Sequence, residues 1–387
     1  MNYRKLGMTG LSVSEIGLGG EWLDRHTTEE CIEIIHHCQQ QGINILDCWM
    51  AGPTVRSNIG KGIAGQREKW FIQGHIGSTW QNDQYVRSRD VNICRQCFED
   101  MLTRFNTDYI DLGMIHYIDE QKEWENVVGK NGEGSPYLYY VRQLKQEGRI
   151  RHIGLSTHNP LIAQQAVESG IVEMILFSIN PAFDMLPATE VVEDHFAEDY
   201  DHTLHGIEPE RAKLYRMCEQ HNVGITVMKG YAGGRLFDAQ QSPFQVALTP
   251  VQCLHYALTR PAVASVLVGV DDISQINAAV AYENATAEER DYASVLANAP
   301  LHSYKGQCTY CGHCLPCPQH IDIAMVNKLL DLAQMQTELP ESIREHYRNL
   351  AHHADECIAC HACEKRCPFE VNITERMQTA AAMYATK

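Results

Sequence analysis

Residues 109–116 read Tyr-Ile-Asp-Leu-Gly-Met-Ile-His, a short and mostly apolar run of the kind that forms a buried β-strand. Runs of the same kind recur along the first three hundred residues, at 43–47, 70–72, 151–155, 174–178, 224–228 and 265–269. Longer amphipathic segments separate these runs. The alternation is typical of parallel β/α units, and eight of them would close a (β/α)8 TIM barrel, a fold that commonly uses about 250 residues.

The segment before residues 43–47 illustrates the helical signal. Thr27 and Glu30 have the spacing of a capping box, and apolar side chains recur at helical intervals from Cys31 to Cys38 before Gly42. This pattern predicts a helix between Thr27 and Gly42.

The carboxyl ends of the strands are where barrels of this kind place their active sites. That rule points to Asp47, His75, His116 and Lys229. Two long polar segments, 119–136 and 190–210, are expected to form loops or added helices over the same end of the barrel, where function tends to collect.

The cysteines are unevenly distributed, because eight of the fifteen fall in the last 80 residues. They form two motifs, Cys308-x-x-Cys311-x-x-Cys314-x-x-Cys317-Pro318 and Cys357-x-x-Cys360-x-x-Cys363-x-x-x-Cys367-Pro368. A disulfide framework is the alternative, but it is typical of small exported domains. The clustering therefore indicates a metal-binding function.

Runs of cysteines that end in Cys-Pro are typical of two-cluster ferredoxins, in which the fourth cysteine of each run binds the other cluster. Transferred to this sequence, one [4Fe–4S] cluster would use Cys308, Cys311, Cys314 and Cys367, and the other Cys357, Cys360, Cys363 and Cys317. Zinc is the alternative, because paired Cys-x-x-Cys also binds it. No strand pattern is visible after about Pro300, so we expect residues 299–387 to form a helical ferredoxin-like domain beside a barrel of residues 1–298.

Composition excludes several other classes of function. The formal net charge is −17, and no basic stripe is present that could neutralise nucleic-acid phosphates. No apolar run approaches the roughly 20 residues that a bilayer span needs. The first residues lack the apolar core of a secretory signal, so we expect a cytoplasmic protein with reduced thiols. Its oligomeric state is left open.

Several stretches together resemble the aldo-keto reductase family. They are Tyr3–Gly7 with Thr9–Ser14, Asn44–Asp47, Tyr109–Leu112 with Ile115–His116, Ile153–Ser156, Met228–Arg235 and Val266–Gly269. The likeness covers about the first 290 residues in order. The cysteine-rich tail is similar to the one found on an iron–sulfur-containing subset of that family. The resemblance implies a (β/α)8 barrel and an oxidoreductase.

Members of that family typically reduce carbonyls with a nicotinamide cofactor and an Asp, Tyr, Lys and His tetrad. Asp47 matches the aspartate and His116 the histidine. His75 stands where the lysine is expected, and residues 48–54 contain no tyrosine. An imidazole can serve as acid or base near neutral pH, so we predict a catalytic set of Asp47, His75 and His116. Tyr117 or a tyrosine from a loop is an alternative proton donor. A further alternative is that His75 has a structural role only and fills a pocket that has lost its activity.

The resemblance also implies a cofactor site at the strand ends. Its expected residues are Ser156, Asn180, Lys229, Gly233, Gly234, Arg235, Gly269 and Gln275. After the last strand the chain reads Val270-Asp271-Asp272, and acidic side chains repel the 2′-phosphate of NADPH. NAD(H) and a flavin remain open, since Gly230 to Gly234 offers backbone donors for a phosphate.

These features favour an iron–sulfur oxidoreductase that acts on a small organic substrate in the barrel pocket. The clusters would pass electrons between that pocket and a carrier such as ferredoxin. The main alternative is an NAD(P)H-dependent carbonyl reductase with structural clusters. A non-redox dehydratase or isomerase that uses the two histidines is a second alternative, and an electron relay or redox sensor with an inactive barrel is a third.

Overall fold

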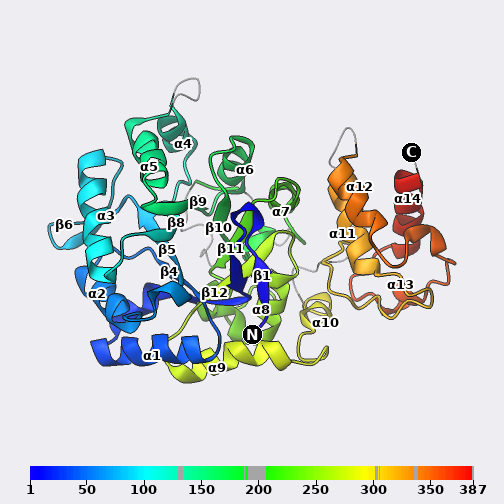
Figure 1. The fold of residues 1–387 in the computed structure, drawn as a ribbon. Helices are drawn as coiled ribbons and strands as arrows, with labels where there is room; N and C mark the ends of the chain where they lie inside the picture. Colours follow the sequence, from blue (N-terminus) through cyan, green and yellow to red (C-terminus); the bar gives the residue numbers. More distant parts are fainter. Residues whose placement is uncertain are drawn as a thin grey trace.

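The structure is a computed structural model that describes residues 1–129, 134–186, 188–190, 206–300, 304, 306–334 and 339–385. Its main feature is a closed barrel of eight parallel strands, surrounded by helices (Figure 1). In chain order, which is also the order around the barrel, the strands are β3 (Ile16–Gly19), β4 (Ile45–Cys48), β5 (Phe71–Ile76), β8 (Ile110–Ile115), β9 (Ile150–Thr157), β10 (Met174–Ser178), β11 (Gly224–Met228) and β12 (Val263–Gly269). The predicted barrel is confirmed.

The helices of the barrel region follow the strands in the order that β/α units require. They are α1 (Thr28–Gln40), α2 (Pro53–Gly62), α3 (Val91–Phe105), α4 (Gln121–Val128), α5 (Pro136–Gln146), α6 (Pro160–Glu168), α7 (Pro209–Gln220), α8 (Pro250–Leu258), α9 (Ile273–Val280) and α10 (Tyr292–Ala297). The capping box of Thr27 and Glu30 forms at the start of α1 as predicted. Helix α4 lies in the first of the two polar segments. Most of the second segment, residues 191–205, lies outside the described residues.

Two features of the barrel region are absent from the sequence-based expectations. The first is strand β3, whose Ile-Gly-Leu-Gly sequence carries too little apolar signal to stand out. The second is a hairpin of β6 (Ser78–Gln81) and β7 (Gln84–Arg87) inserted after β5. Its turn residues Asn82 and Asp83 both have positive φ, the backbone that tight hairpin turns require.

The amino-terminal end of the barrel is closed by a second hairpin, β1 (Tyr3–Lys5) with β2 (Ser12–Ser14). The barrel interior is filled by a separate apolar cluster: Leu6, Val13, Ile45, Leu112, Met114, Met174, Leu176, Ala264 and Leu267. Gly7 fits the hairpin against the start of β11, with φ +49 and a Cβ position only 2.2 Å from the backbone nitrogen of Gly224. A side chain at residue 7 would therefore push the hairpin away from the barrel.

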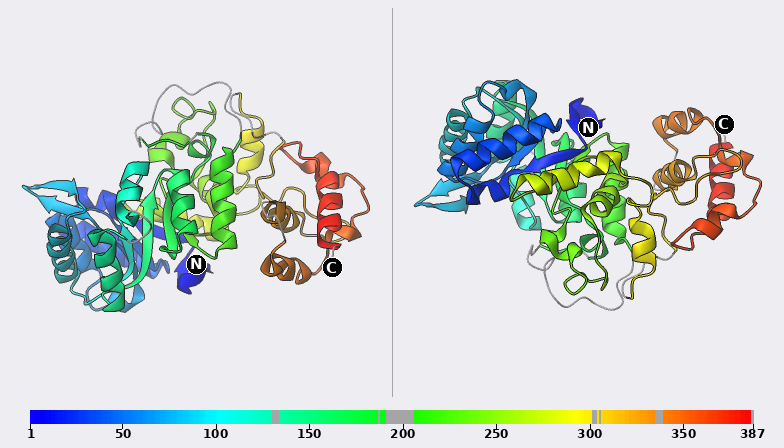
Figure 2. Two further views of the ribbon diagram at one scale, coloured as in Figure 1. Left: turned by 90° about the horizontal axis from the view of Figure 1, so that it is seen from above. Right: turned by 90° about the horizontal axis from the view of Figure 1, so that it is seen from below.

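The carboxyl-terminal region is helical, as expected, and lies to one side of the barrel (Figure 2). Its helices are α11 (Ile323–Gln334), α12 (Glu341–Arg348), α13 (Ala362–Arg366) and α14 (Ile373–Ala385). Helix α11 lies beside α7, and Lys328 forms an ion pair with Glu219 at 2.9 Å. The division at residues 298 and 299 stays a prediction. None of the described helices is long and apolar enough to cross a membrane.

We predict that Gly7→Ala destabilises the barrel more than Gly10→Ala does. Both glycines have positive φ, which costs an L-residue about 1–2 kcal/mol, but only Gly7 lacks space for a Cβ. The clash should add about 1–3 kcal/mol to the loss in the free energy of unfolding. Urea unfolding followed by tryptophan fluorescence measures the difference. Equal losses for the two variants would show that the hairpin does not depend on this close contact.

Candidate active site and cluster-binding cysteines

Three neighbouring barrel strands bring the predicted catalytic residues together. Asp47 lies in β4, His75 in β5 and His116 directly after β8. The His75 Nε2 atom lies 2.9 Å from Asp47 Oδ1, and His75 Nδ1 lies 3.0 Å from His116 Nδ1. All three side chains are buried. Histidine 75 thus bridges the other two.

The hydrogen bonds of Asp47 determine the direction in which this chain of groups donates. Asp47 Oδ1 also accepts from Gln73 Nε2 at 2.8 Å, and Gln73 Oε1 accepts in turn from Thr226 at 2.8 Å. An ionised carboxylate accepts these bonds, so His75 carries its proton on Nε2 and accepts at Nδ1. His116 must then donate from Nδ1, which leaves its Nε2 as an acceptor.

Tyr85 supplies the donor to His116 and was not singled out in the sequence. Its hydroxyl lies 2.7 Å from His116 Nε2. The ring comes from β7 of the inserted hairpin and packs edge-on against Trp49, with the ring centroids 5.4 Å apart. The side chain is 37% exposed, and burial raises its pKa to about 12. The signal that could have revealed it is the Asn82-Asp83 turn between two β-forming runs.

The imidazole of His116 is held neutral. Burial lowers its pKa well below the usual value, and the neighbouring His75 and Arg89 act in the same direction. A neutral imidazole agrees with the accepting Nε2 that Tyr85 requires. The four groups therefore form one directed chain that runs from Tyr85 through His116 and His75 to Asp47.

The chain opens into a cavity of about 890 Å³ at the carboxyl ends of the strands. A volume of this size accommodates a cofactor or a substrate of moderate size. Six of the eight expected cofactor residues line it: Ser156, Lys229, Gly233, Gly234, Gly269 and Gln275. Asn180 and Arg235 do not. Asn180 is fully buried behind the wall, where its amide donates to the backbone oxygen of Lys229 at 2.9 Å.

Two buried hydroxyls on the cavity wall fit a bound ligand. Ser156 Oγ and Tyr231 Oη have no hydrogen-bond partner among the described residues. Buried polar groups are normally paired, so both are suited to hydrogen bonds with a cofactor or substrate. Gly233 and Gly234 have φ of +66° and +89°, and open space surrounds their Cβ positions. Backbone exposed in this way can approach a phosphate closely.

A second acid–imidazole pair lies on the same cavity. His158 Nδ1 is 2.8 Å from Asp119 Oδ2, and His158 Nε2 is 2.8 Å from Lys229 Nζ. Burial lowers the pKa of His158 despite the carboxylate beside it. The neutral ring donates to Asp119 and accepts from Lys229. This arrangement holds the ammonium group of Lys229 at the cavity.

The two acidic residues after β12 take different positions. Asp271 lines the cavity, whereas Asp272 caps α9 by accepting from the backbone nitrogen of Gln275 at 3.0 Å. Gln275 in turn accepts from the backbone nitrogen of Asp271 at 2.9 Å. Of these two residues, Asp271 is therefore the one placed to repel a phosphate in the cavity.

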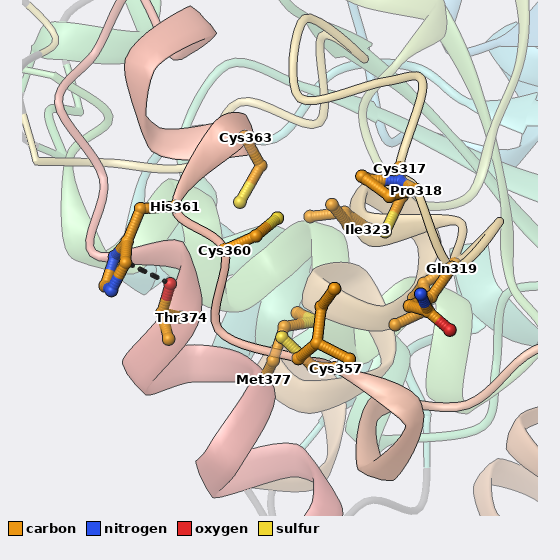
Figure 3. A pocket seen from close by; sticks show the side chains of 12 residues that line it. Cys317, Pro318, Gln319, Ile323, Cys357, Cys360, His361, Cys363, Thr374 and Met377 are labelled. Atoms are coloured by element: carbon orange, nitrogen blue, oxygen red, sulfur yellow. Dashed lines mark hydrogen bonds between the residues drawn. The ribbon is translucent and has the colours of Figure 1, made fainter.

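The eight cysteines of the two motifs surround two small cavities in the carboxyl-terminal region. One cavity is lined by Cys308, Cys311, Cys314 and Cys367. The other is lined by Cys317, Cys357, Cys360 and Cys363, whose side chains point toward a common space (Figure 3). The fourth cysteine of each motif thus lies with the first three of the other. This is the interlocked grouping that the motif predicts.

Zinc and a cubane cluster make different demands on these cysteines. Zinc needs four sulfurs about 2.3 Å from a single point. A cubane cluster binds its thiolates at four separate iron atoms. Within the described ranges, no group of three or more His, Cys, Asp or Glu side chains is placed to hold one metal ion.

Comparisons with known proteins agree with this division of the chain. Residues 15–250 match the model of the aldo/keto reductase family, and residues 307–372 match that of the 4Fe-4S dicluster domain. An uncharacterized oxidoreductase, YqkF of Bacillus subtilis, is 24% identical over 74% of this chain and 92% of its own length. L-galactose dehydrogenase of Arabidopsis thaliana is 25% identical over 72% of this chain and 86% of its own.

Solved structures give the same fold. The holo form of aldo-keto reductase AKR11C1 from Bacillus halodurans aligns with a TM-score of 0.56 at 23% identity. The alignment covers 75% of this chain and 94% of the other. The carboxyl-terminal cysteine region is therefore an addition to a barrel of common type.

We predict that the double variant Cys317→Ala/Cys360→Ala keeps about four irons per chain, half the content expected for two cubanes. Both cysteines line the same cavity, so their loss should remove one cluster only. The matched variant Cys308→Ala/Cys317→Ala takes one ligand from each cavity and should lose both clusters. Iron analysis of anaerobically purified protein distinguishes them. If Cys317→Ala/Cys360→Ala lost both clusters and Cys308→Ala/Cys317→Ala kept one, each motif would hold its own cluster.

Proposed function

Because this chain belongs to the aldo/keto reductase family and carries a 4Fe-4S dicluster domain, we propose that it interconverts a carbonyl and an alcohol on a small organic substrate in the barrel cavity. The observation that carries the proposal is the directed hydrogen-bond chain from Tyr85 to Asp47. It ends in the cavity at a phenol, the group that residues 48–54 lack. The substrate carbonyl would lie against Tyr85.

His116 accepts the hydrogen bond of the phenol and positions it at the cavity. In the direction of carbonyl reduction, the Tyr85 O–H turns from His116 Nε2 to the substrate oxygen and gives it the proton as negative charge develops there. A raised pKa keeps the phenol protonated over the usual range of pH, and its partial exposure lets a solvent proton replace the one it loses. His75 and Asp47 hold His116 in the required tautomer.

In the direction of alcohol oxidation, the Tyr85 oxygen takes the proton of the substrate hydroxyl while its own proton passes along the same chain. The Tyr85 proton moves to His116 Nε2, the His116 Nδ1 proton to His75 Nδ1, and the His75 Nε2 proton to Asp47. Each transfer spans 3.0 Å or less. One chain of neutral imidazoles therefore serves both directions.

Two [4Fe–4S] clusters, when bound by the eight cysteines, pass electrons one at a time. A nicotinamide instead gives two electrons as a hydride, and a flavin can exchange electrons in either way. We therefore propose NAD(H) or a flavin in the cavity, held by Ser156, Tyr231 and the backbone of Gly233 and Gly234. Asp271 disfavours a 2′-phosphate there. We also propose a cytoplasmic location, because the cytoplasm keeps the cysteine ligands from forming disulfides.

A second candidate is an NADH-dependent carbonyl reductase whose clusters only stabilise the fold. The buried hydroxyls of Ser156 and Tyr231, which have no partner among the described residues, fit a bound nicotinamide cofactor as well as a flavin, so they support this candidate equally. In that case hydride transfer would need no electron from the clusters. Whether turnover of the substrate requires electrons from the clusters separates the two candidates.

We predict that Tyr85→Phe lowers kcat for carbonyl reduction by about 10²–10⁴-fold, the usual range for loss of a general acid. KM should change little, because the ring and its packing on Trp49 remain. Tyr117→Phe is the matched control, since Tyr117 lines the same cavity without a hydrogen bond to His116 among the described contacts. Steady-state kinetics on both variants measure kcat and KM. A Tyr85→Phe enzyme as active as the control would remove Tyr85 from the mechanism.

We predict that NADH binds more tightly than NADPH and that Asp271→Ser narrows the difference. The carboxylate at the cavity repels the 2′-phosphate only in NADPH. Trp22 and Trp49 line the cavity, so quenching of their fluorescence reports binding. Asp272→Ser is the control, because Asp272 caps α9 instead. If a flavin is released on denaturation and neither nucleotide quenches, the flavin is the resident cofactor.

A further inference from the structure

The two cluster sites differ in their surroundings, and this difference gives them an order. Building on the proposed function, we propose that a small acidic one-electron carrier protein docks at the site of Cys317, Cys357, Cys360 and Cys363. Electrons then pass to the site of Cys308, Cys311, Cys314 and Cys367 and from there to the barrel. We call these the outer site and the inner site.

The inner site is joined to the barrel by buried hydrogen bonds. Thr309, which follows Cys308, is 1% exposed, and its backbone oxygen accepts from Tyr292 at 3.0 Å and from Arg260. Tyr304 packs on Phe369, two residues after Cys367, with the ring centroids 6.1 Å apart. The Tyr304 hydroxyl lies 3.3 Å from that of Tyr256 in the barrel, so the Cys308 and Cys367 parts of the inner site are both attached to the barrel.

A continuous buried bridge leads from the inner site toward the cavity. The Tyr292 and Tyr256 ring centroids are 5.2 Å apart, and Tyr256 donates to Asp184 at 2.7 Å. Asp184 lies 3.6 Å from Arg211, whose guanidinium donates to the backbone oxygen of His158 at 3.5 Å. His158 lines the cavity. Buried, hydrogen-bonded side chains of this kind connect the inner site to the cavity.

The outer site faces solvent instead. Cys360 is exposed and Ile358 is 60% exposed. Among the described contacts, residues 351–366 form no hydrogen bond or ion pair with the barrel. A carrier can therefore approach the outer site directly, whereas the barrel covers part of the inner one.

The charges beside the outer site select the partner. Lys365 and Arg366 are exposed on α13, two and three residues after Cys363. Glu364, which lies between Cys363 and Lys365, accepts from His361 at 2.7 Å and from the backbone nitrogen of Thr374 at 2.7 Å. Arg366 donates to the backbone oxygens of Cys314 and Pro316 at 2.7 Å. The chain as a whole carries −17, and Asp355 and Glu356 are exposed just before Cys357, where Glu356 is paired with His352 at 2.8 Å. Lys365 and Arg366, together with apolar Ile358, therefore supply the local attraction that an acidic carrier would meet at the outer site.

The electrons balance without a further reactant. Two molecules of reduced carrier each lose one electron, and the substrate carbonyl gains both electrons together with two protons to become an alcohol. One of these protons comes from Tyr85 and is replaced from solvent. The other enters from solvent with the electrons.

The first experiment measures how fast the clusters are reduced in the absence of substrate. A reduced acidic ferredoxin and the methyl viologen radical are mixed with the anaerobic protein, and bleaching near 400 nm is followed by stopped flow. Lys365→Glu and Ile358→Glu should each lower the second-order rate constant with ferredoxin roughly tenfold or more at low salt. The rate with the small cationic viologen should stay within twofold.

Matched controls place the same changes on exposed residues of the barrel helices. Lys122→Glu on α4 and Leu161→Glu on α6 should leave both rates unchanged. The proposal is overturned if these controls slow ferredoxin as much as the docking-face variants do. It is also overturned if Lys365→Glu slows ferredoxin and viologen equally, because the effect then lies in the cluster and not in docking.

A second experiment tests the order of the sites with variants that keep one cluster each. Cys308→Ala/Cys367→Ala removes inner-site ligands and should still be reduced rapidly by ferredoxin. Cys317→Ala/Cys360→Ala removes outer-site ligands and should be reduced slowly by ferredoxin. Equal rates would contradict the order. If reduction follows the predicted order but no carbonyl substrate is turned over, the docking site stands and the proposed function fails.

Discussion

Closure of the parallel barrel is the constraint on which the site depends. Strand β12 pairs with β3, so every strand has two neighbours and the register of each is determined on both sides. Within that register Asp47 lies opposite Gln73, and His75 lies opposite Met114, one strand residue from the end of β8. Three side chains far apart in sequence thereby meet within hydrogen-bond distance. A slip of one residue would turn them away from the cavity.

The hydrogen-bond chain gives the proposed mechanism its direction. His75 lies between Asp47 and His116, so the hydrogen bond that Asp47 accepts is passed on to His116. Because His116 is buried beside Arg89, it does not readily take up a proton from solvent. The proton donor of the proposed mechanism comes from the inserted hairpin, which brings Tyr85 within 2.7 Å of His116.

The junction between barrel and cysteine region is built from buried charges. Asp184 is fully buried; burial raises its pKa, while Arg211 and hydrogen bonds from Tyr215 and Tyr256 oppose that rise. Arg260 is equally buried and reaches the backbone of Thr309. Removing one partner of such a group is costly because it leaves a charge unpaired, so the geometry of the junction is strongly specified.

Periodicity and spacing in the sequence were sufficient for much of this protein. Strand-like runs such as 109–116 and the cap at Thr27 predicted the barrel, since both signals are local in the sequence. The Cys-Pro motifs predicted which cysteines share a cavity, because ligand spacing constrains a short loop. Tyr85 could not be assigned in the same way, because its role depends on where a polar hairpin folds back over the barrel.

The remaining features were decided by tertiary structure. Asn180, expected in the cofactor site, supports the backbone of Lys229 from behind the cavity wall, since strand-end position alone does not give the direction of a side chain. The difference between the inner and outer cluster sites is also invisible in two similar motifs. It arises because Thr309 packs against the barrel while Ile358 meets solvent, and burial is a property of the folded chain as a whole.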